Sequence, residues 1–352
     1  MIGLPLQPPQ SMTGEFDSIQ EKTMLRKIFV LTLFIVLLFG CAPAVSSTPT
    51  FAPTSAPSVT LAPTTATVPP TPTAITLTDG LGRTMTLSHP AQRIVSMAPS
   101  NTEILFAIGA GAQVVGRDEF SDYPAQVKSL PSVGGSMGNY SNEAIVALKP
   151  DLVLAAEINT PDQVKSIEAL GLTVYYLKNP ATLEDMYKNL QIVAQLSGHE
   201  SDAENLITSL KARVAAVDAK LAGVTHKPIV FYEVDATDPG KPYTYGPGTF
   251  GDALIAEAGG INFSTAAGIK DQYPQVGLEQ IVKTNPAIII LGDSNYGGTA
   301  DALKARAGWG TIDAIKNGMI FPFDDNLVSR PGPRLVDGLE LLAKLIHPEL
   351  FQ

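Results

Sequence analysis

The chain has 352 residues, which is enough for two domains or lobes with appended segments, since domains hold roughly 100–200 residues each. Hydrophobic residues make up 45% of it and charged residues 16%, so it can bury sizeable cores. The formal net charge of −10 argues against a nucleic-acid partner, whose phosphates would repel the protein. The same charge argues against adhesion to anionic lipid by electrostatics alone.

The N-terminal stretch has the pattern of an export signal. Residues 28–39 form a nearly continuous apolar run, and Arg26 and Lys27 precede it directly. A short basic segment followed by about a dozen apolar residues is typical of a signal peptide, whereas a membrane span needs roughly 20 residues. Residues 1–23 are polar and fit no export signal, so we expect translation to start at Met24.

The apolar run ends at Cys41, the single cysteine of the chain, which excludes an intramolecular disulfide. Leu38 and Gly40 before it resemble a bacterial lipobox, in which the cysteine is lipidated and becomes the new N-terminus. We therefore expect residues 1–41 to be a signal peptide with a lipobox and Cys41 to carry a lipid anchor. The alternative is an uncleaved membrane anchor with an inert thiol, which also leaves the protein on a membrane.

Residues 42–74 carry no charge and consist almost entirely of Ala, Pro, Ser and Thr. Such a segment cannot bury enough apolar surface to fold and stays extended. We expect it to tether the folded part to the outer face of the cytoplasmic membrane, toward the periplasm or the cell surface.

From residue 75 onward, short apolar strands alternate with helical stretches. The strands expected in the first half are 93–97, 114–115, 152–154 and 174–177. The strands expected in the second half are 229–232, 288–291 and 319–321. Continuous apolar strands separated by helices indicate parallel α/β lobes.

Two helices are predicted with particular features. Ser100 is followed three residues later by Glu103, which predicts a capping box at the start of a helix over residues 101–108. Residues 200–221 place apolar side chains on one face at helical spacing, and a helix of that length spans about 30 Å. This second helix predicts a rigid strut between lobes that would resist large hinge closure.

The expected organisation follows from these elements. The N-terminal lobe spans residues 75–198, the inter-lobe helix 199–224 and the C-terminal lobe 225–352. Residues 143–150 match residues 279–286 at Glu, Ile, Val and Pro, and an apolar strand follows each copy. This echo predicts two similar lobes that face each other across a cleft, where ligands usually bind.

From about Pro90 onward the chain resembles the cobalamin/iron-chelate group of periplasmic binding proteins, the substrate-binding components of ABC importers. The stretches that carry the resemblance are 93–105, 121–124, 143–153 and 273–276. They are closest to the cobalamin-binding branch. The resemblance implies two Rossmann-like α/β lobes joined by one long helix, as in class III binding proteins, with a shallow ligand cleft and little lobe movement.

The resemblance also implies that one acidic residue on each lobe docks onto basic residues of a dimeric permease with its ATPase subunits. Glu143 and Glu279 match those docking positions. Two equivalent carboxylates suit a two-fold partner, and their charge would set register and encounter rate more than affinity. A glutamate in the first turn of a helix also favours the helix dipole without any partner.

For the cleft, Tyr123, Tyr243 and Tyr273 match positions at which the cobalamin branch carries aromatic contacts. Flat rings suit a corrin or a porphyrin, because they offer apolar area with a specific stacking geometry. The further candidate ligand contacts are Arg330, Asn139 and Tyr245. Ala156 stands where the cobalamin branch has a tryptophan, so haem and ferric siderophores stay open as ligands beside cobalamin.

An enzyme on the same scaffold is the alternative function. Residues 134–138 formally match G-x-S-x-G, the nucleophile elbow of serine hydrolases, which would make Ser136 the nucleophile of a surface hydrolase or chelate-processing enzyme. That motif needs a strand directly before it, and Pro131 interrupts the preceding stretch. A sensory or cell-wall interaction protein is a third, weaker hypothesis.

The residues of metal and nucleotide sites are not grouped in this sequence. The four histidines, His89, His199, His226 and His347, are scattered. A His-based metal site or a catalytic histidine is therefore not expected. The sequence also lacks a P-loop and a complete dinucleotide-binding loop. We expect no catalytic residue, metal site or cofactor, and a monomeric binding protein rather than an enzyme.

Overall fold

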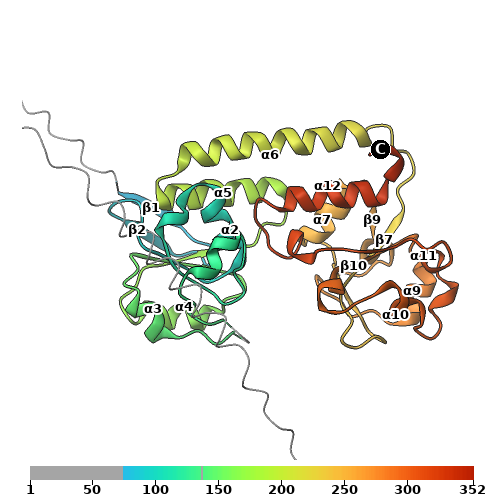
Figure 1. The fold of residues 1–352 in the computed structure, drawn as a ribbon, viewed down its shortest axis with the longest axis horizontal. Coiled ribbons are helices and arrows are strands. Elements are labelled where there is room, and N and C mark those ends of the chain that lie inside the picture. The colour runs from blue at the N-terminus through green and yellow to red at the C-terminus, as the bar shows by residue number, and fades with distance from the viewer. Residues whose placement is uncertain (1–73, 136–137) are drawn as a thin grey trace, which may run out of the picture. The chain divides into compact units, whose positions relative to one another are not determined.

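A computed structural model gives the fold of residues 74–135 and 138–352 (Figure 1). The predictions about the signal peptide, Cys41, the tether up to residue 73 and Ser136 fall outside these described residues. Within the described ranges, no helix is long and apolar enough to cross a membrane.

The N-terminal lobe is built on a four-stranded parallel sheet in the order β4-β3-β5-β6. Its strands are β3 Ile94–Ser96, β4 Val114–Arg117, β5 Leu152–Ala156 and β6 Val174–Leu177. Its helices are α2 Pro99–Ala107, α3 Asn142–Ala147, α4 Pro161–Glu168 and α5 Leu183–Ser197, with the 3₁₀ turns η1 Ala110–Gln113 and η2 Ala125–Ser129. Separate apolar clusters cover the two faces of the sheet, which explains the unbroken apolar sequences of β3, β5 and β6.

An antiparallel hairpin precedes this sheet in the chain. It consists of β1 Ile75–Thr78 and β2 Thr84–Leu87. The backbone N–H of Gly80 donates to the carbonyl of Tyr176 at 2.8 Å, and the Tyr175 hydroxyl donates to the carbonyl of Thr78 at 3.1 Å. These bonds attach the hairpin to the β6 edge, so the chain enters the fold on the N-terminal lobe.

The C-terminal lobe has a five-stranded sheet in the order β11-β10-β7-β8, with β9 also paired to β7. Its strands are β7 Ile229–Asp235, β8 Tyr243–Thr244, β9 Ile261–Asn262, β10 Ile288–Leu291 and β11 Ile320–Pro322. Its helices are α7 Phe250–Glu257, α8 Phe263–Ala266, α9 Leu278–Thr284, α10 Ala300–Lys304, α11 Asp313–Lys316 and α12 Leu335–Ile346. The 3₁₀ turns are η4 Gly292–Tyr296, η5 Trp309–Thr311, η6 Asp325–Leu327 and η7 Pro348–Leu350.

The two lobes share one parallel strand order. In each lobe the second parallel strand along the chain, β4 or β9, lies on one side of the first, and the third and fourth lie on the other. The order therefore reverses between β3 and β5 and between β7 and β10. Such a reversal leaves a crevice at the carboxyl ends of the strands, where ligands bind in open α/β sheets. The α/β class with two lobes predicted from the sequence is confirmed.

The sequence echo also has a structural counterpart. Helix α3 leads into β5 and helix α9 leads into β10, and Ile145 and Ile281 are fully buried at matching positions. Lys149 and Asn285 follow these helices and both adopt positive φ, 48° and 50°. Two non-glycine residues with the same uncommon backbone conformation at equivalent positions indicate the same local fold in both lobes.

The long helix α6, Glu200–Leu221, connects the lobes. It packs on α5 of the N-terminal lobe and on α12 of the C-terminal lobe (Figure 1). Arg213 at its centre pairs with Asp337 and Glu340 of α12, each at 2.6 Å. Because α6 is attached to a helix of each lobe, it cannot swing freely about its ends.

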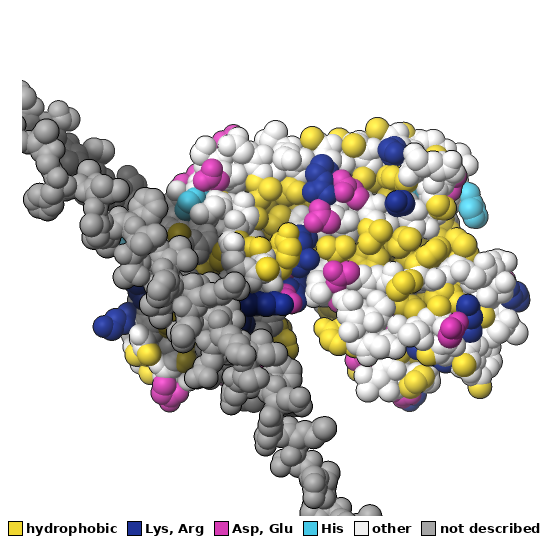
Figure 2. Space-filling model, in the orientation of Figure 1, with side chains coloured by type: hydrophobic (Ala, Val, Ile, Leu, Met, Phe, Trp, Pro, Cys, Tyr) yellow, Lys and Arg dark blue, Asp and Glu magenta, His cyan; other side chains and the backbone are white. Residues whose placement is uncertain are grey.

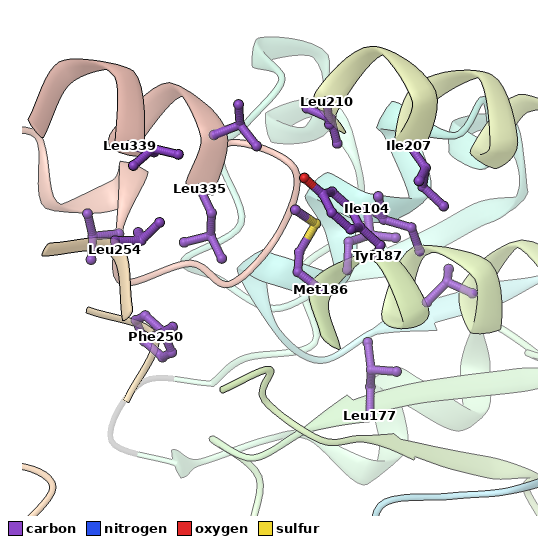
Figure 3. Close-up of a cluster of buried hydrophobic side chains, with 14 of the residues drawn as sticks. Ile104, Leu177, Met186, Tyr187, Ile207, Leu210, Phe250, Leu254, Leu335 and Leu339 are labelled. Atoms are coloured by element: carbon purple, nitrogen blue, oxygen red, sulfur yellow. The ribbon is translucent and has the colours of Figure 1, made fainter. Parts of the chain in front are cut away.

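A continuous apolar cluster lies beneath α6 and includes side chains of both lobes (Figure 3). Ile104 and Met186 enter it from the N-terminal lobe, Leu210 from α6, and Leu254 and Leu339 from the C-terminal lobe. Rotation of one lobe against the other would expose part of this cluster to water, which burial opposes at roughly 25 cal/mol per Å². The packing therefore favours one relative position of the lobes.

The predicted capping box at the start of α2 is wrong. The helix begins at Pro99, Ala98 is its N-cap, and no side chain caps it. Proline is already suited to the first helical position, so no cap is required there. Glu103 instead pairs with Arg334 of the C-terminal part of the chain.

Candidate functional site

A cavity of about 640 Å³ is lined by residues of both lobes. From the N-terminal lobe, Glu157 follows the last residue of β5, and Lys178 and Asn179 follow β6. From the C-terminal lobe, Gln272 and Tyr273 complete the lining with the start of α7. The cavity thus lies at the carboxyl ends of the N-terminal strands, as expected for this sheet topology. Figure 2 shows a hollow between the lobes on the side away from α6.

Tyr273 is the predicted ligand contact that lines this cavity. Its side chain is 49% exposed, and its ring is tilted against that of Tyr245, with centroids 6.0 Å apart. Burial raises the pKa of Tyr273, and the charge of Glu157 adds to the shift, so the phenol stays neutral at physiological pH. Tyr273 can therefore offer a ring face and a hydroxyl to a ligand.

Tyr245 does not have the position predicted for a ligand contact. It is only 2% exposed and packs against Tyr232, Phe250 and Tyr273, with ring centroids 5.0–6.0 Å apart. Tyr245 comes directly after β8, which ends at the buried Thr244, and Tyr245 is buried as well, so the two neighbours do not alternate between core and surface. Tyr245 supports Tyr273 from behind.

The other predicted tyrosines lie on the surface outside this cavity. Tyr243 is 40% exposed in β8, and a backbone bridge pairs it with Gln275, two residues after Tyr273. Tyr123 is 47% exposed, forms a cis peptide bond with Pro124, and lies beneath the guanidinium of Arg334 at 4.2 Å from the ring centroid.

Asn139 is exposed, and its backbone carbonyl accepts a hydrogen bond from the N–H of Gly135 at 2.7 Å. Gly134 pairs with Tyr140 in an isolated antiparallel bridge, and residues 130–135 form no strand. The strand required before a nucleophile elbow is therefore missing there.

Arg330 is engaged within the protein. Its Nη1 donates to Asp122 Oδ1 at 2.6 Å and to Glu103 Oε1 at 3.2 Å. Burial raises the pKa of Asp122, but the hydrogen bond and charge of Arg330 outweigh burial and leave the pKa lowered. A ligand acid that reached Arg330 would have to compete with these carboxylates.

The two predicted docking glutamates occupy matching places. Glu143 lies in the first turn of α3 and Glu279 in the first turn of α9, and both are exposed. Figure 1 shows both helices on the side of the lobes away from α6. Four residues after the glutamate, α3 has Ala147 and α9 has Lys283, so the two surfaces are similar without being identical.

Sequence reasoning missed the polar residues of the cavity, Glu157, Lys178, Asn179 and Gln272. A signal for the first three was present, because Lys178 directly follows a strand that the sequence predicts, Asn179 comes next, and Glu157 lies three residues after the end of another predicted strand. Carboxyl ends of parallel strands are binding positions. Among residues 74–135 and 138–352, no group of three or more His, Cys, Asp or Glu side chains is placed to hold a metal ion.

The comparisons with known proteins agree with this geometry. Residues 94–327 match the family model described as periplasmic binding protein. The chain is 34% identical over 283 residues to the uncharacterized ABC transporter substrate-binding lipoprotein YvrC of Bacillus subtilis, covering 79% of this chain and 87% of that protein.

Two solved structures show the same fold. The periplasmic heme-binding protein RhuT of Roseiflexus sp. RS-1 is 30% identical, with 74% of this chain and 99% of that chain covered and a TM-score of 0.66. The periplasmic vitamin B12 binding protein BtuF of Vibrio cholerae is 26% identical, with 75% and 99% covered and a TM-score of 0.63.

Proposed function

Because the chain belongs to the periplasmic binding protein family, we propose that it is the lipid-anchored substrate-binding component of an ABC importer and that it captures a flat metal chelate. The observation that carries the proposal is the cavity between the lobes, with the half-exposed ring of Tyr273 held from behind by Tyr245. Vitamin B12 and heme, named for two similar structures, both hold their metal in a near-planar macrocycle. A corrin or porphyrin is the ligand class that such a ring suits best.

The polar lining supports the same ligand class. Corrins and porphyrins carry amide or carboxylate groups at their edges, and the amides of Asn179 and Gln272 and the ammonium of Lys178 can donate hydrogen bonds to such groups. The volume of about 640 Å³ lies within the usual range of small-molecule sites. A chelate larger than this cavity would extend into the open cleft.

Delivery to a membrane partner is the second part of the proposal. The exposed carboxylates of Glu143 and Glu279 lie one on each lobe, at matching positions of helices that are similar in sequence and are followed by the same backbone turn. A permease dimer with a basic residue on each subunit would meet both at once. The lipid anchor at Cys41 would hold the protein on the outer face of the cytoplasmic membrane, near that permease.

The test is a titration of the full-length protein in detergent, followed by visible absorption and calorimetry. The probes are cyanocobalamin, cobinamide, haemin and a ferric siderophore. We expect tight one-to-one binding of one macrocyclic chelate, weakened roughly 5- to 30-fold by Tyr273→Ala, because a lost aromatic contact costs about 1–2 kcal/mol.

Tyr296→Ala is the matched control, because Tyr296 is 86% exposed, belongs to the same lobe and does not line this cavity. It should bind like the unaltered protein. Absence of binding to every macrocyclic chelate would overturn the proposal, and binding of the siderophore alone would overturn the planar-ligand part of it.

A further inference from the structure

A second connection between the lobes lies away from α6. Residues 330–334, here called the crossing segment, run from η6 of the C-terminal lobe to the start of α12 and lie against α2 of the N-terminal lobe. Gly332 is close enough that a Cβ there would lie 3.6 Å from both Ile104 and the carbonyl oxygen of Ser100. The contact joins parts of the chain that are far apart in sequence, since the hydrogen bonds from Arg334 to Glu103 connect residues 231 positions apart.

Glu103 of α2 is the centre of this connection. Arg334 donates to it through Nε at 2.7 Å and Nη2 at 2.5 Å, and Arg330 donates at 3.2 Å. The Glu103 side chain is 1% exposed, and those of the two arginines are 13% and 14% exposed. Charged groups that are this well shielded from water need partners of opposite charge. Here the carboxylate of Glu103 and the two guanidinium groups, which come from different lobes, are each other's partners.

The same arginines hold the loop that carries Tyr123. Arg330 pairs with Asp122 at 2.6 Å and approaches the carbonyl oxygen of Phe120 at 3.4 Å. Arg334 covers the ring of Tyr123 at 4.2 Å. Side chains from the C-terminal part of the chain thus contact both ends of the segment 120–123 of the N-terminal lobe.

We propose that the cluster of Glu103, Asp122, Arg330 and Arg334 is an inter-lobe clamp that sets the cleft angle and the orientation of Tyr123 before ligand arrives. Together with the sequence prediction that Tyr123 contacts the ligand, this makes Arg334 and Glu103 positioning residues for ligand binding that act through that ring. α6 and the clamp attach the lobes at two separate places, so hinge motion requires the bidentate Arg334–Glu103 pair to break. A preset cleft also avoids part of the ordering cost of binding.

The first test needs no ligand and does not depend on the proposed function. In a Cys41→Ser background, spin labels at Ser166→Cys on α4 and Ala305→Cys after α10 report the inter-lobe distance, since both sites are exposed and lie one on each lobe. We expect a narrow distance distribution that broadens or shifts in Arg334→Gln.

Lys344→Gln is the control for this measurement, because it removes the same charge from an exposed position of α12 outside the clamp. An Arg334→Gln distribution as narrow as that of the control would overturn the clamp. If Arg334→Gln does not fold, as judged by circular dichroism, Arg330→Gln takes its place. It leaves the Arg334–Glu103 pair intact and should broaden the distribution less, and an unchanged distribution would count against the proposal.

The second test rests on the proposed function and uses a double-mutant cycle with cyanocobalamin and haemin as probes. In the unaltered protein, Arg334→Gln should weaken binding of the accepted probe about tenfold. In a protein that already carries Tyr123→Ala, the same substitution should weaken binding about twofold or less. The effect should stay about tenfold with Tyr273→Ala, whose ring the clamp does not touch.

Arg334→Lys should recover only part of the affinity, because lysine keeps the charge and loses the two-pronged geometry. Full additivity of Arg334→Gln with Tyr123→Ala would refute positioning through that ring. Failure of the unaltered protein to bind either probe would instead count against the proposed function, and the distance measurement would still decide the clamp.

Discussion

Replacing Tyr245 by alanine tests how the core and the cleft depend on each other. The ring is 2% exposed, contacts three other aromatic rings and fills the space beside Gly251, where a Cβ would lie 2.4 Å from it. Removing an aromatic side chain from such a site costs about 3–5 kcal/mol, since transfer energy is lost and a cavity remains. For a folded unit of this size that corresponds to a fall in Tm of roughly 10 °C.

The same substitution should weaken ligand binding. Tyr273 would lose the ring behind it and sample other rotamers, so we expect an affinity for the accepted chelate lower by about 5- to 10-fold. Tyr245→Phe keeps the ring and should change stability by less than about 1 kcal/mol, with little change in affinity. Urea unfolding followed by circular dichroism gives the stability, and calorimetry at 10 °C on the folded variant gives the affinity.

Two results would contradict this reasoning. A Tyr245→Ala protein that is as stable as the unaltered one would show that the ring does not belong to a packed core. A destabilised protein with unchanged affinity would show that Tyr273 keeps its orientation without Tyr245. A folded-fraction measurement before each titration separates a loss of affinity from a loss of native protein.

Three further outcomes are expected. Combined Glu143→Gln and Glu279→Gln should lower chelate uptake by cells roughly tenfold and leave chelate binding unchanged, which transport and titration assays compare directly. Cys41→Ser should abolish incorporation of labelled fatty acid. Burial and, less strongly, Glu233 raise the pKa of Asp293 to about 6, so its ionisation between about pH 4 and pH 6 destabilises the fold. Thermal unfolding should therefore show Asp293→Asn stabilised by about 1 kcal/mol at pH 7 and hardly at all at pH 4.

Elements defined by local pattern could be predicted from the sequence. The apolar strands and the helix over residues 200–221 follow directly from hydrophobic periodicity, and α6 has the same bounds in the structure. The similarity between residues 143–150 and 279–286 also predicted that the two lobes share a local fold. In the structure, the buried isoleucine and the positive-φ residue occur at matching positions of the two segments. Such features depend on neighbours close along the chain.

The interactions of Glu103 could not be predicted in this way. Ser100 and Glu103 satisfy a local capping rule, yet the carboxylate is taken by Arg334, 231 positions later. The difference between Tyr243 and Tyr245 was also hidden, because Tyr245 lies after the end of β8 and packs among aromatic rings from other parts of the C-terminal lobe. The partner of Glu103 and the burial of Tyr245 both depend on contacts between elements that are distant in sequence. Hydrophobic periodicity and motif spacing carry no information about such contacts.

Under the proposed docking, the matched helices α3 and α9 bear on how often encounters with a permease dimer succeed. On a two-fold permease dimer, a protein with two nearly equivalent docking faces can land in either of two orientations half a turn apart. Two productive orientations double the encounter rate and contribute RT ln 2, about 0.4 kcal/mol, to the binding free energy. The two orientations have equal energy because the permease is two-fold symmetric, so the differences between the faces, such as Ala147 against Lys283, affect how well each face docks and not which orientation is preferred. If the proposed docking holds, the repeated helices let one chain contact both subunits of a symmetric partner with similar surfaces.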